Sequence, residues 1–452
     1  MKKIALIILV FFAFATVRCS REHAVNYSEV QVSQVSGEQW GTWSGEVHLI
    51  GDVVVPCDKT LTISSGTKII SDGYFQICVG GSLSAVGREN ARISFTVADT
   101  TGYSNYTDAE AGAWKGLLFE KPGTVRLNYC DFSYGKNGLE QDGGVMLVYM
   151  ASDMEIANCR FHHNTTRRRG GAMYAVSSEL NIHDCEVYDN FAAGFEGSYC
   201  WGVGFQFLKC TIDMHDMVFH DNYSEVAYGG GMNIDSCNLE LTNAVFYNNF
   251  AVDAGGLGLQ RSKEYSVKVS NMLAYNNAVI HYGGGLAVAT TDAELNNLTI
   301  VNNYCGGGGG AGMQTAFDAN PTLTNCIFWD NHAFYLTNDY EYDTVDYYMG
   351  SQIWLWGSNC YPMFNNGVVQ YGLDSISGHE HLPKDHYNNM LEVSPQFVDI
   401  KHHDYRLQSN SPCINNGSTN ISSLFIPPTD LAGNPRIFGG IIDMGCYEWQ
   451  GN

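Results

Sequence analysis

The sequence predicts an all-β fold, a single-stranded right-handed parallel β-helix, from three observations. Its 452 residues include 49 Gly against 10 Pro, with 13% aromatic and 16% charged residues, a composition typical of a turn-rich β protein. A unit of 26 to 32 residues repeats between residues 128 and 331. Each unit alternates apolar and polar residues over short stretches and lacks a helical period, as one coil of a β-helix does, and parallel crossovers favour the right hand.

The first element is a predicted secretory signal over residues 1–19. Lys2 and Lys3 precede an apolar run that is too short to span a bilayer. Two processing routes are open: cleavage after Ala15, or lipidation at Cys19, which ends the apolar run. We favour lipidation, with residues 20–40 as tether and N-terminal cap. No later apolar run approaches bilayer length, so we expect contact with a membrane only through a lipid anchor.

Residues 41–333 are predicted to form the coils. Each unit has an apolar anchor position that we place in the interior, at Cys130, Cys159, Cys185, Met217, Ala244, Met272, Leu298 and Cys326. Five positions later the same residue recurs, as Asn164, Asn190, Asn222, Asn249, Asn277, Asn303 and Asn331. Equivalent positions of successive coils stack about 4.8 Å apart, so we expect these asparagines to form a hydrogen-bonded ladder at a turn.

Two further columns repeat in phase with the anchor. The residue before it is usually Asn or Asp, which tolerate the left-handed conformation, so Asp184 and Asp216 are assigned to a bend. About a dozen residues before the anchor, a glycine cluster leads into an apolar strand, here called the glycine strand. Its outward column is predicted to carry no carboxylate and no base: Leu147, Tyr174, Gln206, Asn233, Gly258, Ala287 and Gln314.

The repeat weakens after residue 333. Residues 334–350 are predicted to form an irregular aromatic and acidic loop, and residues 351–452 further coils and a capping module. The loop and its flanks interleave tyrosines with carboxylates, at Asp339, Glu341, Asp343 and Asp346. Carboxylate clusters can bind Ca²⁺, although this spacing matches no EF-hand loop. Calcium is therefore one candidate cofactor, and no cofactor is established by the sequence.

Some motifs resemble known families. Gly170-Gly171-Ala172-Met173 and Phe328-Trp329-Asp330-Asn331 are similar to the GGA and Phe-x-x-Asn repeats of polymorphic outer-membrane adhesins. Ser411-Pro412-Cys413-Ile414-Asn415 and the segment 443–448 resemble the C-terminal module of secreted β-helix lipoproteins of the choice-of-anchor type, common in Bacteroidetes. The resemblance implies an exported β-helix protein at the outer membrane or cell surface. The wider fold also includes polysaccharide lyases and hydrolases, so it does not fix an activity.

The fourteen cysteines divide into two groups. Those at the anchor position share their column with Met, Ala and Leu, and we expect them to be buried thiols. Cys210 and Cys237 lie on adjacent coils at a spacing that permits a disulfide, and Cys413 with Cys446 is a second candidate pair. No Cys-x-x-Cys and no His-Glu-x-x-His motif indicates a zinc site.

Candidate catalytic residues lie on the strand before the anchor. Its outward columns bring His183 next to His215, with Asp213 and Glu240 beside them. Imidazoles next to carboxylates can act as general acid and base or bind a metal ion. The alternative is a solvated polar strand face without a function.

Candidate ligand-binding residues come from two loops on successive coils. One supplies Arg167, Arg168 and Arg169; the other supplies the aromatic residues Phe195, Tyr199 and Trp201. Arginine recognises carboxylates and sulfates, and flat aromatic rings stack on sugars. We expect the two loops to lie side by side and near the histidines. The alternatives are solvated arginines and aromatic rings that pack on their own solenoid.

These features favour an exported monomer that binds a polysaccharide or cell-surface glycan, or acts as an adhesin, without established catalysis. The formal charge of −23 argues against a nucleic-acid partner. The location would be the outer membrane or cell surface, alternatively the periplasm or the medium. The alternative function is a polysaccharide lyase or glycoside hydrolase acting on an acidic polymer through His183, His215 and Asp213.

Overall fold

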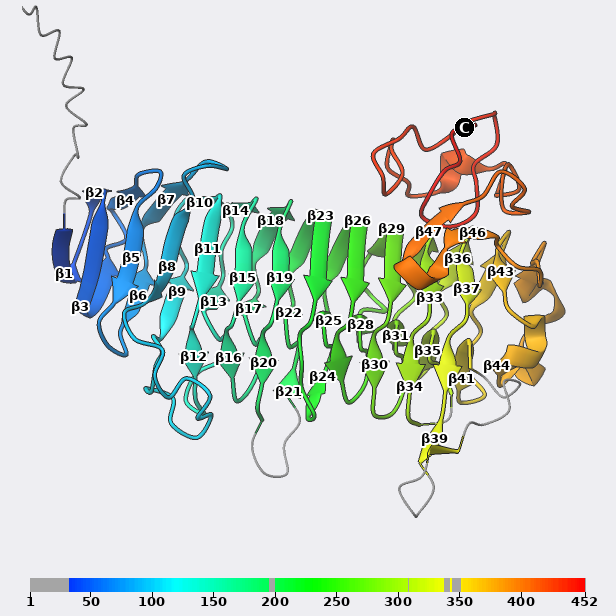
Figure 1. The fold of residues 1–452 in the computed structure, drawn as a ribbon, viewed down its shortest axis with the longest axis horizontal. Coiled ribbons are helices and arrows are strands. Elements are labelled where there is room, and N and C mark those ends of the chain that lie inside the picture. Colours follow the sequence, from blue (N-terminus) through cyan, green and yellow to red (C-terminus); the bar gives the residue numbers. More distant parts are fainter. Residues whose placement is uncertain (1–31, 195–199, 308, 337–341, 344–350, 452) are drawn as a thin grey trace, which may run out of the picture.

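The protein is a solenoid of stacked coils, as the sequence predicts (Figure 1). The computed structural model describes residues 32–194, 200–307, 309–336, 342–343 and 351–451. One 34-stranded sheet runs through all coils, and each of its strand pairs is parallel and in register with the next coil. The described residues contain no α-helix and, among them, no helix long and apolar enough to cross a membrane.

Three rows of strands form the walls of the solenoid. The row of glycine strands comprises β6 (Gln76–Val79), β9 (Gly116–Glu120), β13 (Met146–Tyr149), β17 (Met173–Val176), β22 (Phe205–Leu208), β25 (Met232–Asp235), β28 (Leu257–Gln260), β31 (Leu286–Ala289), β35 (Met313–Ala316), β41 (Ile353–Trp356) and β44 (Ile376–Ser377). The second row comprises β2 (Gly41–Trp43), β4 (Thr60–Ile63), β7 (Ser82–Val86), β10 (Val125–Asn128), β14 (Met154–Ala157), β18 (Glu179–His183), β32 (Glu294–Asn296), β36 (Thr322–Thr324), β42 (Met363–Asn365) and β45 (Tyr387–Asn388). The third row begins at the anchor residues and comprises β5 (Lys68–Ser71), β8 (Ile93–Val97), β11 (Cys130–Ser133), β15 (Arg160–His162), β19 (Glu186–Tyr188), β33 (Thr299–Val301), β37 (Ile327–Trp329) and β43 (Val368–Val369).

Some strands span two rows, and short pieces close the coils. The long strands are β3 (Glu46–Val55), β23 (Thr211–His220), β26 (Asn238–Tyr247) and β29 (Val267–Tyr275), and β1 (Val32–Glu38) pairs with β3 at the N-terminal end. Two-residue strands follow the asparagine turn: β12 (Lys136–Asn137), β16 (Thr165–Thr166), β20 (Phe191–Ala192), β21 (Cys200–Trp201), β24 (Ala227–Tyr228), β27 (Phe250–Ala251), β30 (Ala278–Val279), β34 (Tyr304–Cys305) and β38 (His332–Ala333). The remaining elements are the antiparallel pairs β39 (Tyr335–Leu336) with β40 (Tyr342–Asp343) and β46 (Phe397–Asp399) with β47 (Asp404–Leu407), and the 3-10 turns η1 (Gly372–Ser375), η2 (His379–His381), η3 (Lys384–His386), η4 (Ile400–His402) and η5 (Ile421–Ser423).

The interior is filled by the columns that the repeat predicts to face inward. All eight anchor residues are buried, and the predicted buried thiols Cys159 and Cys185 are among them. Phenylalanines two positions after the anchor stack between coils, with ring centroids 4.9 Å apart for Phe95 and Phe132 and again for Phe132 and Phe161. The core is therefore a continuous apolar rod rather than a cavity.

The asparagine ladder is confirmed. Each side-chain amide from Asn164 to Asn303 donates to the Oδ1 atom of the next asparagine at 2.9 to 3.0 Å, and that same Oδ1 also accepts the backbone N–H of the donor residue. The ladder ends where Asn331 donates to Gln352 at 2.7 Å. Buried polar groups at the turn are thereby satisfied from coil to coil.

The predicted bend is also confirmed, because the residue before the anchor has a left-handed backbone in all eight coils. The φ angle is 53° at Asp184 and 55° at Asp216.

The glycine cluster has a steric cause, since neighbouring backbones approach closely there. A Cβ atom on Gly255 would lie 2.5 Å from the carbonyl oxygen of Gly284. Only glycine therefore fits at this corner of the coil.

The C-terminal residues leave the solenoid and cover part of its outer wall. The coils end at β45, and Figure 1 shows the following segment, in orange and red, lying against the side of the coils near β29 and β37. Its core packs on outward-facing apolar residues of the third row; the two sides of this contact are Leu273, Val301, Ile327 and Val368 from the coils, and Phe397, Tyr405, Leu407, Cys413, Met444 and Cys446 from the module. The capping module thus covers a side of the solenoid in addition to following its last coil.

Replacing Asn249 with Ala tests the ladder. Its amide group donates to the Phe219 carbonyl and to Asn277, both at 2.9 Å, and its oxygen accepts from Asn222. Loss of this group leaves several buried partners unpaired, so we expect a destabilisation of about 3 kcal/mol or more. The control is Asn248→Gly, since Asn248 is a left-handed bend residue whose side chain makes an exposed bond to Asp221. Urea midpoints measure both effects, and equal shifts would contradict a special role for the ladder.

Candidate functional site

The predicted histidine pair is formed by neighbouring strands. His183 ends β18 and stands directly opposite His215 of β23 in the parallel register. Their rings are nearly parallel, with an interplanar angle of 11° and centroids 4.8 Å apart. Both side chains face outward and are partly exposed. The stacking of coils therefore brings together two imidazoles that are 32 residues apart in the sequence.

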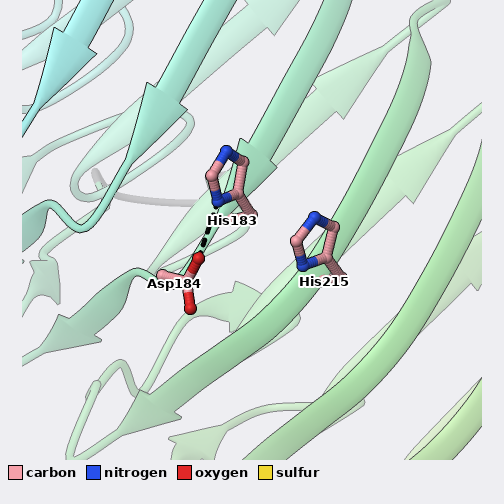
Figure 2. A group of neighbouring side chains, drawn as sticks. All are labelled: His183, Asp184 and His215. Atoms are coloured by element: carbon pink, nitrogen blue, oxygen red, sulfur yellow. Dashed lines mark hydrogen bonds and ion pairs between the residues drawn. The ribbon is translucent and has the colours of Figure 1, made fainter.

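Each imidazole is held by the aspartate that follows it. Nδ1 of His183 lies 2.7 Å from Oδ2 of Asp184, and Nδ1 of His215 lies 2.7 Å from Oδ2 of Asp216 (Figure 2 shows the first pair). The left-handed bend turns each carboxylate back toward the preceding ring. The assignment of Asp184 and Asp216 to the bend is thus confirmed, and these carboxylates additionally orient the histidines.

The other predicted members of this site lie on the same wall. Asp213 precedes His215 by two residues on β23 and is exposed, while its register partner Glu240 bonds Lys268 Nζ at 2.9 Å. Glu155 lies nearer, with Oε1 3.5 Å from His183 Nε2. His183, Asp184 and His215 offer ligand atoms within 4.8 Å of one another, the group in the described ranges suited to hold a metal ion.

The three predicted arginines are all engaged rather than freely solvated. Arg167 Nε donates to the Gly194 carbonyl at 3.2 Å, and Arg168 Nη1 to the Leu139 carbonyl at 3.1 Å. Arg169 Nη1 donates to the Tyr174 hydroxyl at 3.1 Å, and its guanidinium lies over the same ring. Each planar group is therefore fixed in orientation, as recognition of a carboxylate requires.

The arginines and Trp201 are neighbours, as the two-loop arrangement predicts. Arg169 and Trp201 form a parallel bridge on adjacent coils, and the Trp201 ring lies 5.3 Å from that of Tyr228. The other two predicted aromatic residues, Phe195 and Tyr199, lie outside the described residues. So do Cys19 with the whole predicted signal, and Asp339, Glu341 and Asp346 of the proposed calcium loop.

The outward column of the glycine strands differs from the prediction. Leu147, Tyr174, Gln206, Asn233 and Gln314 are buried, because the chain that leads into each glycine cluster folds across the strand. This wall also holds carboxylates. Asp142 precedes the glycines of its coil, and Asp235 ends β25. The predicted column itself contains no carboxylate and no base; the acidic groups of this wall lie beside it, in positions that the prediction did not include.

Asp142 forms an ion pair at this wall with the half-exposed Arg168. Its side chain is 9% exposed, and Oδ1 lies 3.3 Å from Nε of Arg168. Burial raises the pKa of the Asp142 carboxyl, and the nearby Arg168 and Arg169 oppose this shift. Burial likewise raises the pKa of the Tyr149 and Tyr174 phenols beside it. The group combines a buried acid, two guanidinium groups and two phenols.

A third arginine reaches the same wall from the opposite edge of the strand. Arg261 Nε donates to Asp235 Oδ1 at 2.9 Å, its Nη2 also bonds Asp235, and its guanidinium lies 5.8 Å from the centre of the Trp201 ring. We name Asp142, Arg168, Arg169, Trp201 and Arg261 the arginine face. In a chain of charge −23, it gathers three arginines on one wall together with the partly buried Trp201.

The histidine pair and the arginine face do not form one site. Around a coil, Arg168, Arg169 and Trp201 precede the glycine strand and Arg261 directly follows it, whereas the histidines lie at the far end of the second row, next to the bend. Figure 1 shows β18 and β23 along one edge of the solenoid and β16, β20 and β21 along the other. The structure therefore keeps the predicted catalytic and binding residues on different walls.

A polar pocket of about 540 Å³ lies where the C-terminal module meets the second row of strands. Amides, hydroxyls and carboxylates line it, including Asn296, Asn320, Thr322, Asn365 and Asn420. Asn296 holds the module by donating to the Phe425 carbonyl at 3.1 Å, while its own Oδ1 is buried without a partner. The pocket was not anticipated, because the path of the module does not follow the repeat.

All thirteen cysteines in the described ranges are free thiols. Cys210 and Cys237 point the same way in adjacent coils, and each Sγ donates to a carbonyl of its own coil. Cys413 and Cys446 share the core of the C-terminal module without a bond between them. Neither candidate disulfide is therefore present in the structure.

The comparisons agree with the architecture. Residues 83–271, from β7 to β29, match the protein family described as right handed beta helix region. A comparison with curated proteins gives no significant match. The chain is thus a right-handed parallel β-helix repeat protein, and its narrower resemblance to adhesins and choice-of-anchor lipoproteins stays a prediction.

Thiol titration tests the state of the cysteines. Cys57 is exposed, whereas burial raises the pKa of Cys326, Cys413 and Cys446 to about 12 and slows their reaction. We expect one fast-reacting thiol in the native protein, lost in Cys57→Ser. After denaturation without reductant, all thirteen thiols of residues 32–451 should react. If two or four of these thiols failed to react, one or both of the predicted disulfides would be present.

Proposed function

We propose that the protein binds an acidic polysaccharide along its arginine face. The observation that carries this proposal is the arrangement of Arg168 and Arg169 on Asp142 and Tyr174, next to Trp201 on the following coil. Oriented guanidinium groups suit the carboxylates of uronic acids or the sulfates of sulfated glycans. Since the chain is strongly acidic overall, a local group of arginines is the place where such a polymer can approach.

The geometry of the solenoid suits an extended ligand. Coils rise by about 4.8 Å, so a polymer that lies along the solenoid axis meets equivalent positions of successive coils. Asp142, Arg169, Trp201 and Tyr228 follow one another in this way, because Gly143 bonds the Arg169 carbonyl and Trp201 pairs with both neighbours. Such a row places charged groups on two coils next to aromatic side chains on the following two.

The proposal includes export. The apolar segment 4–17 after two lysines supports secretion, and Cys19 supports a lipid anchor at the outer membrane or cell surface. We further propose that the protein acts as a monomer. An adhesin that recognises a glycan on another cell is a form of the same function, while an adhesin that recognises protein would use a different chemistry.

Arg168→Gln should weaken binding to polyuronate by about tenfold or more, because a charge-assisted hydrogen bond contributes about 1.5 to 3 kcal/mol. Arg126→Gln is a matched control, since both arginine side chains are 37% exposed and both pair with an aspartate. Affinity electrophoresis against uronic, sulfated and neutral polymers measures the effect. Arg168→Lys retains the charge next to Asp142, so its affinity should lie between those of the wild type and Arg168→Gln. Equal losses in Arg126→Gln, or no binding to any acidic polymer, would contradict the proposal.

A second candidate function is cleavage of the bound polymer, by a lyase or hydrolase. The burial that raises the pKa of the Asp142 carboxyl favours it, because burial shifts a carboxyl toward the role of a general acid that protonates a leaving oxygen. Arg169 would neutralise the substrate carboxylate, as proton removal next to that group requires. The histidine pair stays an alternative catalytic set, on the other wall.

If the protein cleaves, Asp142→Asn should reduce the rate by about a hundredfold or more. Asp131→Asn, which alters a comparable aspartate paired with Arg92 at 2.8 Å, is the control and should retain the rate. Ultraviolet absorbance of unsaturated uronate detects a lyase, and new reducing ends detect a hydrolase. If activity survives Asp142→Asn but is lost in a His183→Gln, His215→Gln double variant, the histidine pair is the catalytic set. A bound polymer of unchanged length would exclude cleavage.

A further inference from the structure

We propose that His183, His215 and Asp184 form a binding site for a divalent transition-metal ion, with zinc as the expected ion. This inference does not depend on the arginine face or on glycan binding. It rests on the position of three ligand-type side chains on adjacent coils, within 4.8 Å of one another. Imidazole and carboxylate are both ligands of Zn²⁺, and two histidines with one carboxylate is a common zinc donor set.

The backbone holds the donors in place. The two histidines are register partners in a sheet that continues for several coils on both sides, so their Cα atoms cannot separate. Asp184 is fixed by its left-handed bend, with Oδ2 already 2.7 Å from His183 Nδ1. Figure 2 shows both rings with the Nδ1 edge directed toward the side where Asp184 lies. An ion on that edge would meet nitrogen from two coils and oxygen from one.

The surrounding charge favours a cation. Asp216 lies on the Nδ1 edge of His215 in the same way as Asp184 on that of His183, which adds a second carboxylate next to the pair. Glu155 faces Nε2 of His183 at 3.5 Å, and Asp213 stands two residues before His215. Two cations on the same wall, Arg126 and Lys268, are paired with Asp153 and Glu155 and with Glu240. Several carboxylates thus surround two imidazoles.

Binding requires only side-chain movement. With zinc–nitrogen distances of about 2.0 to 2.1 Å, the two coordinating nitrogens would lie closer together than the two ring centroids do in this structure, where they are 4.8 Å apart. His215 is 39% exposed and Asp184 47% exposed, so both can turn toward the ion without displacing core residues. Three protein ligands would leave a position open for water. Because a metal ion binds only unprotonated imidazole nitrogens, its affinity should fall as the pH is lowered.

The bend column offers a conservative way to remove the carboxylate. Other coils have asparagine at this position, with the same left-handed backbone at Asn158 and Asn243. Asp184→Asn therefore preserves the fold while it removes the charge. A matched control exists in the next bend, where His220 bonds Asp221 at 2.7 Å in the same manner. His220 stacks on Tyr188 and Tyr247 instead of a second histidine, so it cannot supply a pair of imidazoles.

The test is titration of the full-length, chelator-treated protein with Zn²⁺, followed by calorimetry, and with Co²⁺, followed by its visible spectrum. We expect one ion per chain and a Co²⁺ spectrum without thiolate charge transfer, because the described thiols are distant from the site or buried. His215→Gln should lower the affinity by about a hundredfold and Asp184→Asn by about ten- to a hundredfold. His220→Gln should leave it unchanged.

Three outcomes would overturn the proposal: no binding by the wild type, an affinity unchanged in both His215→Gln and Asp184→Asn, or an equal loss in His220→Gln. Thermal denaturation without metal shows whether each variant folds. A variant that folds like the wild type yet loses zinc supports the site directly. Since glycan binding is measured separately with Arg168→Gln, failure of the metal site and failure of the glycan proposal remain distinguishable.

Discussion

The register of the parallel coils is the constraint on which the rest of this structure depends. Backbone hydrogen bonds hold each coil in step with the next, so a residue type that recurs at one phase of the repeat becomes a continuous column in space. Inside, columns of Phe, Met and Cys form the apolar core, and at the turn the asparagines satisfy one another. A shift by one residue in any coil would place its apolar side chains in water and break the ladder at both neighbours. The register also determines which outward side chains become neighbours on adjacent coils.

The same constraint explains how the C-terminal module finds its place. The first outward position after the anchor is charged in the earlier coils, as at Arg160 and Glu186. From β23 onward it is apolar at Val218, Val245, Leu273 and Ile327, and the module covers Leu273 and Ile327. The C-terminal module therefore buries hydrophobic side chains on a side of the solenoid where they would otherwise be exposed to solvent. The polar pocket with Asn296 lies at the edge of this contact.

The sequence was sufficient to predict what depends on periodicity. The fold class, the buried anchors, the asparagine ladder, the left-handed bends and the contact of His183 with His215 all follow from positions that repeat in phase. It was insufficient where the chain leaves the period. The segments that cross the glycine strands differ in length from coil to coil, so the burial of Tyr174 and the ion pair of Asp142 with Arg168 could not be derived. The residue before each glycine cluster also forms a column, which contains Asp142, Arg169 and Trp201. Had this column been considered, the charged and aromatic groups of this wall would have been predicted.

The histidine pair shows how a solenoid can acquire a site at small cost to its stability. The bend before the anchor accepts Asn or Asp, since both tolerate the left-handed conformation, so a carboxylate there satisfies the backbone as well as an amide does. The outward position before that bend does not face the core and holds Ala157, His183, His215 and Thr242 in successive coils. Two histidines with two aspartates therefore appear on adjacent coils through changes that leave the core and the ladder intact. Since the glycine-strand wall and this one use different residues, a substitution that tests one site leaves the side chains of the other in place.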